Sequence, residues 1–282
     1  MSLSQRWPYE LLLGWRYTRA GRATRRNGFI SFISAASMLG IALGVAALII
    51  VLSVMNGFQK DVAGRMLSVI SHVEVFSPDG GALPDVQRTL SEVRAHPEVI
   101  GAAPFIGAQG LLARGETMQG AIVRGIDPAL EPNVTDVAAE MRDTLLPKLV
   151  PGEFGILLGS DLARKLGVGE GDQVTLIAPS GQVTPAGVVP RLKQMTVVGT
   201  FSSGHYEYDS ALAMLNIEDA ARIFRLERPI GIRLKLRDLH HARQVADQLA
   251  GSLSGHLLIL DWTRQNRTWF AAVQLEKRMM FI

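Results

Sequence analysis

The densest cluster of side chains that could do chemistry is the run His205-Tyr206-Glu207-Tyr208-Asp209. An imidazole beside carboxylates can act as a general base or bind a metal ion. His240 and His241 are adjacent, so on a helix they would point to different faces and make poor metal ligands. A loop with local hydrogen bonds is the alternative interpretation of residues 205–209, and these residues define no reaction.

A glycine-rich stretch, Gly167-Val-Gly169-Glu-Gly171-Asp172, resembles a phosphate-binding loop only in composition. It follows an expected helix and precedes an expected strand, whereas a phosphate-binding loop runs from strand to helix. We therefore predict a helix C-cap followed by a turn. The sequence contains no Walker A, zinc-protease or nucleophile-elbow motif and no cysteine. We expect no catalytic residue, metal site or cofactor in this chain.

The elements that must position any site begin with an apolar run. Residues 29–59 contain no Asp, Glu, Lys, Arg or His, and about 20 apolar residues are enough to span a bilayer. We predict a transmembrane helix over 29–58 rather than a cleaved signal peptide, whose apolar region is about 7–15 residues long. Residues 1–28 carry six arginines, which predicts a cytoplasmic N-terminus.

The same basic segment accounts for the high isoelectric point of about 9.4. Residues 29–282 are slightly acidic, so nucleic-acid binding is disfavoured. Aromatic residues interleaved with the arginines favour an interfacial helix at the inner membrane surface or an ordinary anchor flank. They are Trp7, Tyr9, Trp15 and Tyr17.

Strands alternate with helices between the two apolar ends, which predicts an α+β fold for residues 59–265. One β-α-β unit is expected near 71–106 and a second near 230–260, and together they bracket an inserted subdomain near 130–220. If the two units share one sheet, both ends of the domain lie beside the membrane. Residues 266–282 have the composition of the start of a second transmembrane helix.

An unusual segment, Pro179 to Pro190, lies between two expected strands. Hairpin loops usually have 2–5 residues, and the prolines exclude an interior strand, so we predict a stiff projecting arm that could dock to a partner. An ordinary long surface loop is the alternative. The candidate docking residues are Pro179, Val183, Pro185, Val188, Val189 and Pro190, with Arg191 and Lys193 at the base.

Several stretches together resemble the lipoprotein-releasing (Lol) ABC transporter permeases of the LolC/LolE family. The resemblance covers essentially the whole chain, and the order and spacing of the stretches carry it rather than any single motif. They are Gly40-Ile-Ala-Leu-Gly-Val-Ala-Ala-Leu48, Leu52-Ser-Val-Met-Asn-Gly-Phe58, Arg124-Gly-Ile-Asp-Pro128, Leu158-Gly-Ser-Asp-Leu-Ala-Arg-Lys-Leu-Gly-Val-Gly-Glu-Gly-Asp172, Val198-Gly-Thr-Phe201 and Leu275-Glu-Lys-Arg-Met-Met280.

The resemblance implies an inner-membrane permease subunit with a MacB-like periplasmic domain of two mixed α/β subdomains. Such permeases work with a cytoplasmic ABC ATPase, which uses the ATP, and with a second permease subunit, the same or a sister chain. They extract outer-membrane lipoproteins from membrane lipid and pass them to a soluble periplasmic chaperone. Four membrane helices are expected in this family, so we expect this chain to be a truncated product.

The resemblance also assigns residues. The arm at 179–190 corresponds to a hook that captures the chaperone, and Arg191 and Lys193 correspond to a supporting basic pad, although Thr175 and Leu192 do not match the pad. Val51, Val54 and Met55, at the end of the first helix, would contact the acyl chains of the lipoprotein.

Two other functions remain open. One is a membrane-anchored mechanotransmission or regulatory permease subunit of the macrolide-export or cell-division type, for which a chaperone-binding hook has no use. The other is an anchored periplasmic hydrolase centred on residues 205–209.

Overall fold

The computed structural model describes residues 9, 13–14, 28–67, 69–184 and 187–265. The chain divides into two compact units, Met1–Asp61 and Val62–Ile282. The expected basic segment at 1–28 and the expected second membrane helix at 266–282 lie almost entirely outside the described residues.

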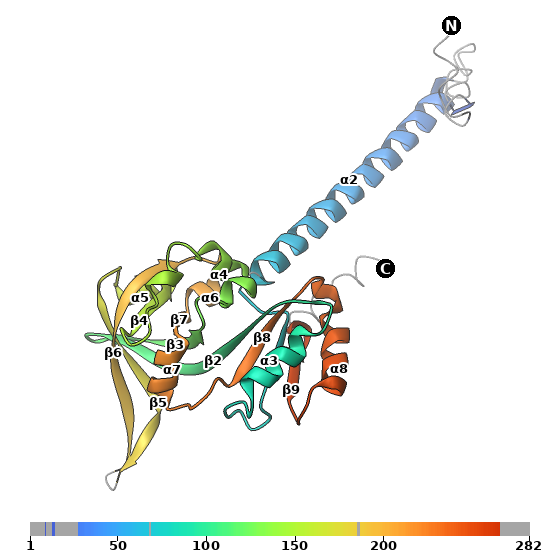
Figure 1. Ribbon diagram of the computed structural model, residues 1–282. Coiled ribbons are helices and arrows are strands. Elements are labelled where there is room, and N and C mark those ends of the chain that lie inside the picture. The colour runs from blue at the N-terminus through green and yellow to red at the C-terminus, as the bar shows by residue number, and fades with distance from the viewer. Residues whose placement is uncertain (1–8, 10–12, 15–27, 68, 185–186, 266–282) are drawn as a thin grey trace. The chain divides into compact units, whose positions relative to one another are not determined.

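The first unit consists mainly of helix α2, which runs from Gly28 to Leu67 and whose last residues belong to the second unit (Figure 1). Its stretch Phe32–Met55 has 24 residues with a mean hydropathy of 2.7, and none of its strongest window is buried within the structure. At 1.5 Å per residue, this stretch is about 36 Å long and exceeds the roughly 30 Å of a bilayer core. The predicted apolar helix is therefore present and long enough to span a membrane.

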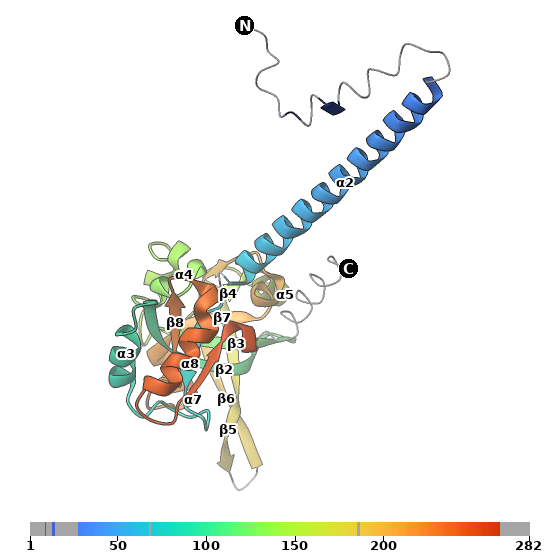
Figure 2. The same ribbon diagram turned by 90° about the vertical axis from the view of Figure 1, so that its right-hand side faces the viewer.

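The second unit is built on one mixed sheet of nine strands among the described residues, in the order β3-β7-β4-β6-β5-β2-β8-β1-β9. Figures 1 and 2 show helices packed along this sheet and a long hairpin that extends from it. The strands are β1 Val73–Phe76, β2 Val99–Arg114, β3 Thr117–Ile126, β4 Gly155–Gly159, β5 Gln173–Thr184, β6 Gly187–Phe201, β7 Leu212–Asn216, β8 Gly231–Leu236 and β9 Leu258–Asp261.

The helices mostly occupy the predicted positions. The expected helix over 134–145 was wrong in length, because only Asp136–Glu140 is helical and three successive backbone N–H groups then donate to the carbonyl of Met141, which makes a turn. The helices are α3 Val86–Arg94, α4 Asp136–Glu140, α5 Ser160–Leu166, α6 Tyr206–Asp209, α7 Ile217–Phe224, α8 Ala242–Ser252 and α9 Trp262–Gln265, with 3₁₀ turns η3 Glu131–Asn133, η4 Leu146–Lys148 and η5 Leu239–His241.

Strand β2 joins the two halves of the sheet. Its first part pairs with β8, which in turn pairs with β1, and its last part pairs with β3 and β5. The sequence predicted separate strands at 99–106 and 110–113, and this was wrong because one strand of 16 residues runs through both. As a result, the two β-α-β units share one sheet, as predicted, and the strands between them continue the same sheet.

Three hydrophobic clusters form the core. The first lies among β1, β8, α3 and α8, and includes Val73, Leu90 and Val245. The second and third lie around β4 to β7 and include Leu158 and Leu157, respectively. The strand β2 contributes Ala102 to the first cluster and Ile106 and Leu112 to the second. One strand therefore anchors both halves of the unit.

Gly125 on β3 sets how closely helix α7 can approach the sheet. A Cβ at this position would lie 2.4 Å from the Cβ of Ala220 and 3.3 Å from the Cβ of Ile106. Gly120 on the same strand has no neighbour within 4 Å of its Cβ position. Only the first of these two glycines is required by packing.

We therefore predict that Gly125→Ala destabilises the protein by about 1–3 kcal/mol, because an added methyl in a close-packed core forces the backbone to shift. Gly120→Ala is the matched control and should change stability by less than about 1 kcal/mol. Chemical unfolding in detergent, followed by circular dichroism, measures both. Equal effects of the two substitutions would contradict this packing.

His72 lies between α2 and β1 and is bonded to β8. Its Nδ1 accepts from the backbone N–H of Leu236 at 3.0 Å, and its own N–H donates to the carbonyl of Leu234 at 2.9 Å. Burial lowers the pKa of His72 below its usual 6.5, and Lys235 lowers it further against the opposing effects of Asp136, Asp238 and the hydrogen bond. The folded protein therefore favours neutral imidazole.

From this shift we predict that the free energy of unfolding falls as the pH decreases from about 7 to 5. The unfolded chain binds the proton at a higher pH than the folded chain, so stability present above pH 6.5 is lost as the pH falls through the folded pKa. His72→Gln should flatten this dependence. Unfolding curves at several pH values would test it, and identical slopes for the two proteins would contradict it.

Candidate functional site

The segment at 179–190 forms the outer part of a long hairpin made by β5 and β6, which projects from the body of the second unit (Figure 1). The strands pair at Ala178↔Arg191, lose register, and pair again from Gln182↔Val189 to Thr184↔Gly187. Residues 185–186, and with them the predicted hook residue Pro185, lie outside the described residues. The expectation of a 12-residue loop was wrong, because most of the arm is paired strand.

Proline chemistry explains the break in register. Pro179 and Pro190 lie where the pairing shifts, so three residues of β5 face one residue of β6. A residue without a backbone N–H is tolerated at such a bulge and not within a regular ladder. The prolines were correctly interpreted as incompatible with a regular ladder, but the resumption of pairing beyond them has no signal in composition. Val183 and Val188 are direct partners in the resumed ladder.

The two basic residues of the predicted pad face the body of the domain. Lys193 places its Nζ 3.4 Å from the centroid of the Phe154 ring, a cation–π contact. Arg191 donates from Nη1 to the carbonyl of Ile223 at 3.4 Å, at the end of α7. The structure therefore uses these side chains to support the base of the hairpin, and their contact with a partner stays a prediction.

The partner of Lys193 is itself fixed by α7. The buried carboxylate of Asp219 accepts from the N–H groups of Gly152 at 2.8 Å and Phe154 at 3.1 Å. Phe154 has a φ of 54°, a conformation that a side chain rarely adopts without such support. A chain of contacts thus connects α7, the turn at 152–154 and the hairpin.

The opposite face of the hairpin base is apolar. Leu111, Ile177 and Leu192 are cross-strand neighbours on β2, β5 and β6, and the Leu192 side chain is 66% exposed. A groove of about 690 Å³ lies beside them, and its lining includes Ile122, Pro179 and Pro190. A contiguous exposed apolar surface of this kind marks an interaction site.

Sequence reasoning missed this apolar groove. The signal was the alternation of exposed and buried residues on β2, where Leu111 is exposed and Leu112 is buried. The same alternation places Leu192 on the face opposite Arg191 and Lys193, because successive side chains of a strand point to opposite faces. Assigning the groove required the pairing of three strands, which only the fold provides.

Comparison with known proteins places this architecture. Residues 34–251 match the family model of the MacB-like periplasmic core domain. The chain belongs to this family. A solved structure of the periplasmic region of MacB from Actinobacillus actinomycetemcomitans aligns with a TM-score of 0.39 and 12% identity, covering 72% of this chain and 93% of that one.

Two curated relatives are similar over almost the whole chain. The "Lipoprotein-releasing system transmembrane protein LolC" of Xylella fastidiosa (strain Temecula1) is 45% identical, and the alignment covers 98% of this chain and 65% of the relative. The protein of the same name from Neisseria meningitidis serogroup B is 46% identical, with coverages of 97% and 65%. This chain therefore spans about 65% of the length of these relatives. The family, the relatives and helix α2 together indicate an inner-membrane protein.

In the MacB-like domain, residues 205–209 form the local network that the alternative interpretation predicted. The carboxylate of Asp209 accepts from the N–H of Ser203 at 2.7 Å and from the Oγ of Ser202 at 2.9 Å. The rings of His205 and Tyr208 are in contact at 5.3 Å between centroids. No group of three or more His, Asp or Glu side chains suited to a metal ion occurs among the residues that the structure describes.

The glycine stretch at 167–172 has the predicted conformation. Gly167 ends α5 with a φ of 67°, and the N–H of Gly169 donates to the carboxylate of Asp172 at 2.9 Å. It is therefore a helix cap and a turn, as predicted.

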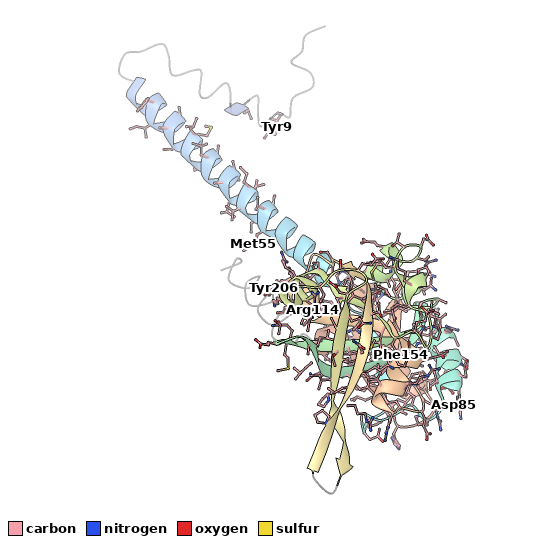
Figure 3. All side chains as sticks on the ribbon, turned by 90° about the vertical axis from the view of Figure 1, so that its left-hand side faces the viewer. Tyr9, Met55, Asp85, Arg114, Phe154 and Tyr206 are labelled. Carbon is pink, nitrogen blue, oxygen red and sulfur yellow. The ribbon has the colours of Figure 1, made fainter. Side chains whose placement is uncertain are left out.

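The proposed acyl-chain residues lie on α2. Val51, Val54 and Met55 have the i, i+3, i+4 spacing that places them on one helix face, and both valine side chains are mostly exposed (Figure 3 labels Met55). Their contact with lipid or lipoprotein stays a prediction.

The paired geometry of the arm predicts a specific cross-link. Because directly opposed residues of antiparallel strands have Cα atoms about 4.5–5.5 Å apart, Val183→Cys/Val188→Cys should form a disulfide on mild oxidation. The chain has no native cysteine, so the gel-shift or mass readout is unambiguous. Val183→Cys/Val189→Cys is the control, shifted by one residue to opposite faces. Equal cross-linking of the two variants would indicate an irregular loop.

Proposed function

We propose that this protein is a permease subunit of an ABC transporter that extracts outer-membrane lipoproteins from the inner membrane and hands them to a soluble periplasmic chaperone. The observation that carries the proposal is the 45% identity with a lipoprotein-releasing system transmembrane protein over 98% of this chain. The projecting hairpin and the apolar groove at its base support it, because transfer to a chaperone requires an exposed docking surface.

The proposed orientation places the N-terminus in the cytoplasm and the MacB-like domain in the periplasm. Six arginines precede the apolar helix, and the positive-inside rule assigns such a flank to the cytoplasm. In this orientation the hairpin lies in the same compartment as a periplasmic chaperone.

The proposed division of labour leaves ATP hydrolysis to a cytoplasmic ABC ATPase subunit, so this chain holds no cofactor. A second permease subunit, the same or a sister chain, would complete the membrane part. Lipoprotein acyl chains would contact Val51, Val54 and Met55, whose apolar side chains suit lipid.

The hairpin would dock the chaperone with little loss of entropy. Its strands are paired up to Thr184↔Gly187, so its backbone is already ordered before binding. The exposed Leu192 and the groove lined by Ile122, Pro179 and Pro190 would bury apolar surface of the partner. Arg191 and Lys193 would hold the base of the hairpin in place.

A second candidate follows from the family match alone. MacB-like periplasmic core domains would also suit a membrane-anchored mechanotransmission or regulatory subunit. Such a subunit has no reason to bind a lipoprotein chaperone, so chaperone binding separates the two candidates.

We predict that the full chain in detergent binds a purified soluble Lol-type chaperone in the micromolar range, on the order of −8 kcal/mol. Pro185→Asp/Val188→Asp and, separately, Leu192→Asp should each weaken binding by at least about tenfold, or about 1.4 kcal/mol, because a charge opposes burial of the surface. Titration calorimetry or a pull-down measures this.

Gln244→Asp, on the exposed face of α8, is the matched control and should bind like the native protein. Unchanged binding by the hairpin variants would remove the hook assignment. Failure of the native chain to bind would favour the mechanotransmission candidate.

A further inference from the structure

The segment between α2 and β1 is inserted into two cores at once. Val69 is buried in the cluster that contains Ile126 and Leu212, whereas Ile70 is buried in the cluster of Val73 and Leu234. Two successive residues after the membrane helix therefore pack into opposite halves of the domain. Any displacement of this segment must disturb both cores.

A fully buried arginine holds the same segment. Arg233, in the middle of β8, is 0% exposed and lies between the core residues Ile232 and Leu234. Its Nη2 donates to the carbonyl of Val69 at 2.8 Å, and its Nε donates to the Oγ of Ser71 at 3.4 Å. Both acceptors belong to the chain that leaves α2.

The third nitrogen of the same guanidinium reaches the other half of the domain. Nη1 of Arg233 forms an ion pair with Oε1 of Glu131 in η3, whose side chain is also 0% exposed. Glu131 accepts from the Oγ1 of Thr135 at 3.4 Å. One planar group therefore connects β8, the segment after α2 and the turn that precedes α4.

The charges around this pair come from several elements. Glu74 on β1 lies 3.5 Å from Nε of Arg233, and Arg124 on β3 is a second buried guanidinium. Burial, and next the charge of Arg233, lower the pKa of Arg124 to about 10, while Glu74 and Glu131 oppose the shift. Two arginines and two glutamates balance each other, so removal of one of each keeps the cluster neutral.

Stability alone does not explain a buried guanidinium at this position. Moving a charge out of water is costly, and replacing a buried ion pair with apolar residues of similar volume is often neutral or stabilising. An apolar side chain cannot, however, hold a backbone carbonyl, a hydroxyl and a carboxylate in one fixed arrangement. The planar fork of arginine can do so, because its donors have fixed directions.

The second end of the domain meets the same place. The N–H of Trp262 donates to the carbonyl of His72 at 3.1 Å, and β9 pairs with β1 at Val73↔Asp261. The carboxylate of Asp261 then accepts from the N–H of Thr263 at 2.9 Å, at the start of α9. The segments by which the chain enters and leaves the domain are thus adjacent, and the Arg233 cluster lies beside the first of them.

We propose that Arg233 is a positioning residue that fixes the chain leaving α2 to the central sheet and to the half of the domain that carries the hairpin, so that movement of the membrane helix is transmitted to the hairpin. The use of this movement in transport rests on the proposed function. The fixing of the segment does not, and it can be measured on the chain alone.

The test uses spin labels on the full chain in lipid nanodiscs. One label pair, Gly57→Cys with Gln244→Cys, reports on α2 relative to the domain. The other, Gln87→Cys with Gln244→Cys, lies within one half of the domain and is the control pair. Both pairs are placed in the otherwise native protein, in Arg233→Lys and in the neutral double variant Arg233→Met/Glu131→Gln.

We expect the neutral double variant to unfold within about 5 °C of the native protein, because no unpaired charge is left behind. Its distance distribution between residues 57 and 244 should nevertheless become about twofold broader, and that between 87 and 244 should not change. Arg233→Lys should broaden the first distribution too, since an ammonium keeps the charge but lacks the planar fork. Arg233→Met alone should lower the unfolding temperature by about 10 °C, since Glu131 is left buried without its partner.

An unchanged 57-to-244 distribution in the folded double variant would overturn the proposal. So would broadening of both label pairs, because that result indicates general loosening of the domain. Chaperone binding in the same variants distinguishes the two levels. If the native chain binds no chaperone but the label distances change as expected, the proposed function fails and the role of Arg233 stands.

Discussion

A buried ion pair between β8 and η3 is the constraint on which the arrangement of the domain depends. Arg233 and Glu131 are both fully buried, and the remaining donors of the arginine hold the carbonyl of Val69 and the hydroxyl of Ser71. Because buried charges must be paired, neither residue can move without exposing the other to an apolar surrounding. The path of the chain after α2 and the approach of the two halves of the sheet are therefore decided together.

Strand β2 carries this constraint toward the hairpin. It pairs with β8 at one end and with β5 at the other, so the sheet is continuous from the Arg233 cluster to the base of the arm. The arm is then supported on one face by contacts of Lys193 with Phe154 and of Arg191 with the end of α7. A mixed sheet with such supports is a rigid connection, because paired strands and packed side chains deform little.

The two faces of the hairpin base have different roles, which follow from strand alternation. The basic residues turn toward the body, where an aromatic ring and a backbone carbonyl receive them, and Leu192 is left exposed between them in sequence. A surface for a partner is thus apolar where the sequence suggested that it would be basic. In the proposed function, binding at this surface would depend more on burial of apolar area than on attraction between charges.

The sequence by itself determined the features that depend on local order. An uncharged run of 31 residues predicts a membrane-length helix, the glycine at 167 predicts a helix cap, and alternation predicts most strands. Only the tertiary structure decided the rest, since it depends on contacts between residues far apart in the chain. The pairing of the arm beyond its prolines, the apolar groove across β2, β5 and β6, and the meeting of Arg233 with Glu131, 102 positions away, all have this origin. Composition and spacing cannot reveal them, because each requires the register of strands that the whole core fixes.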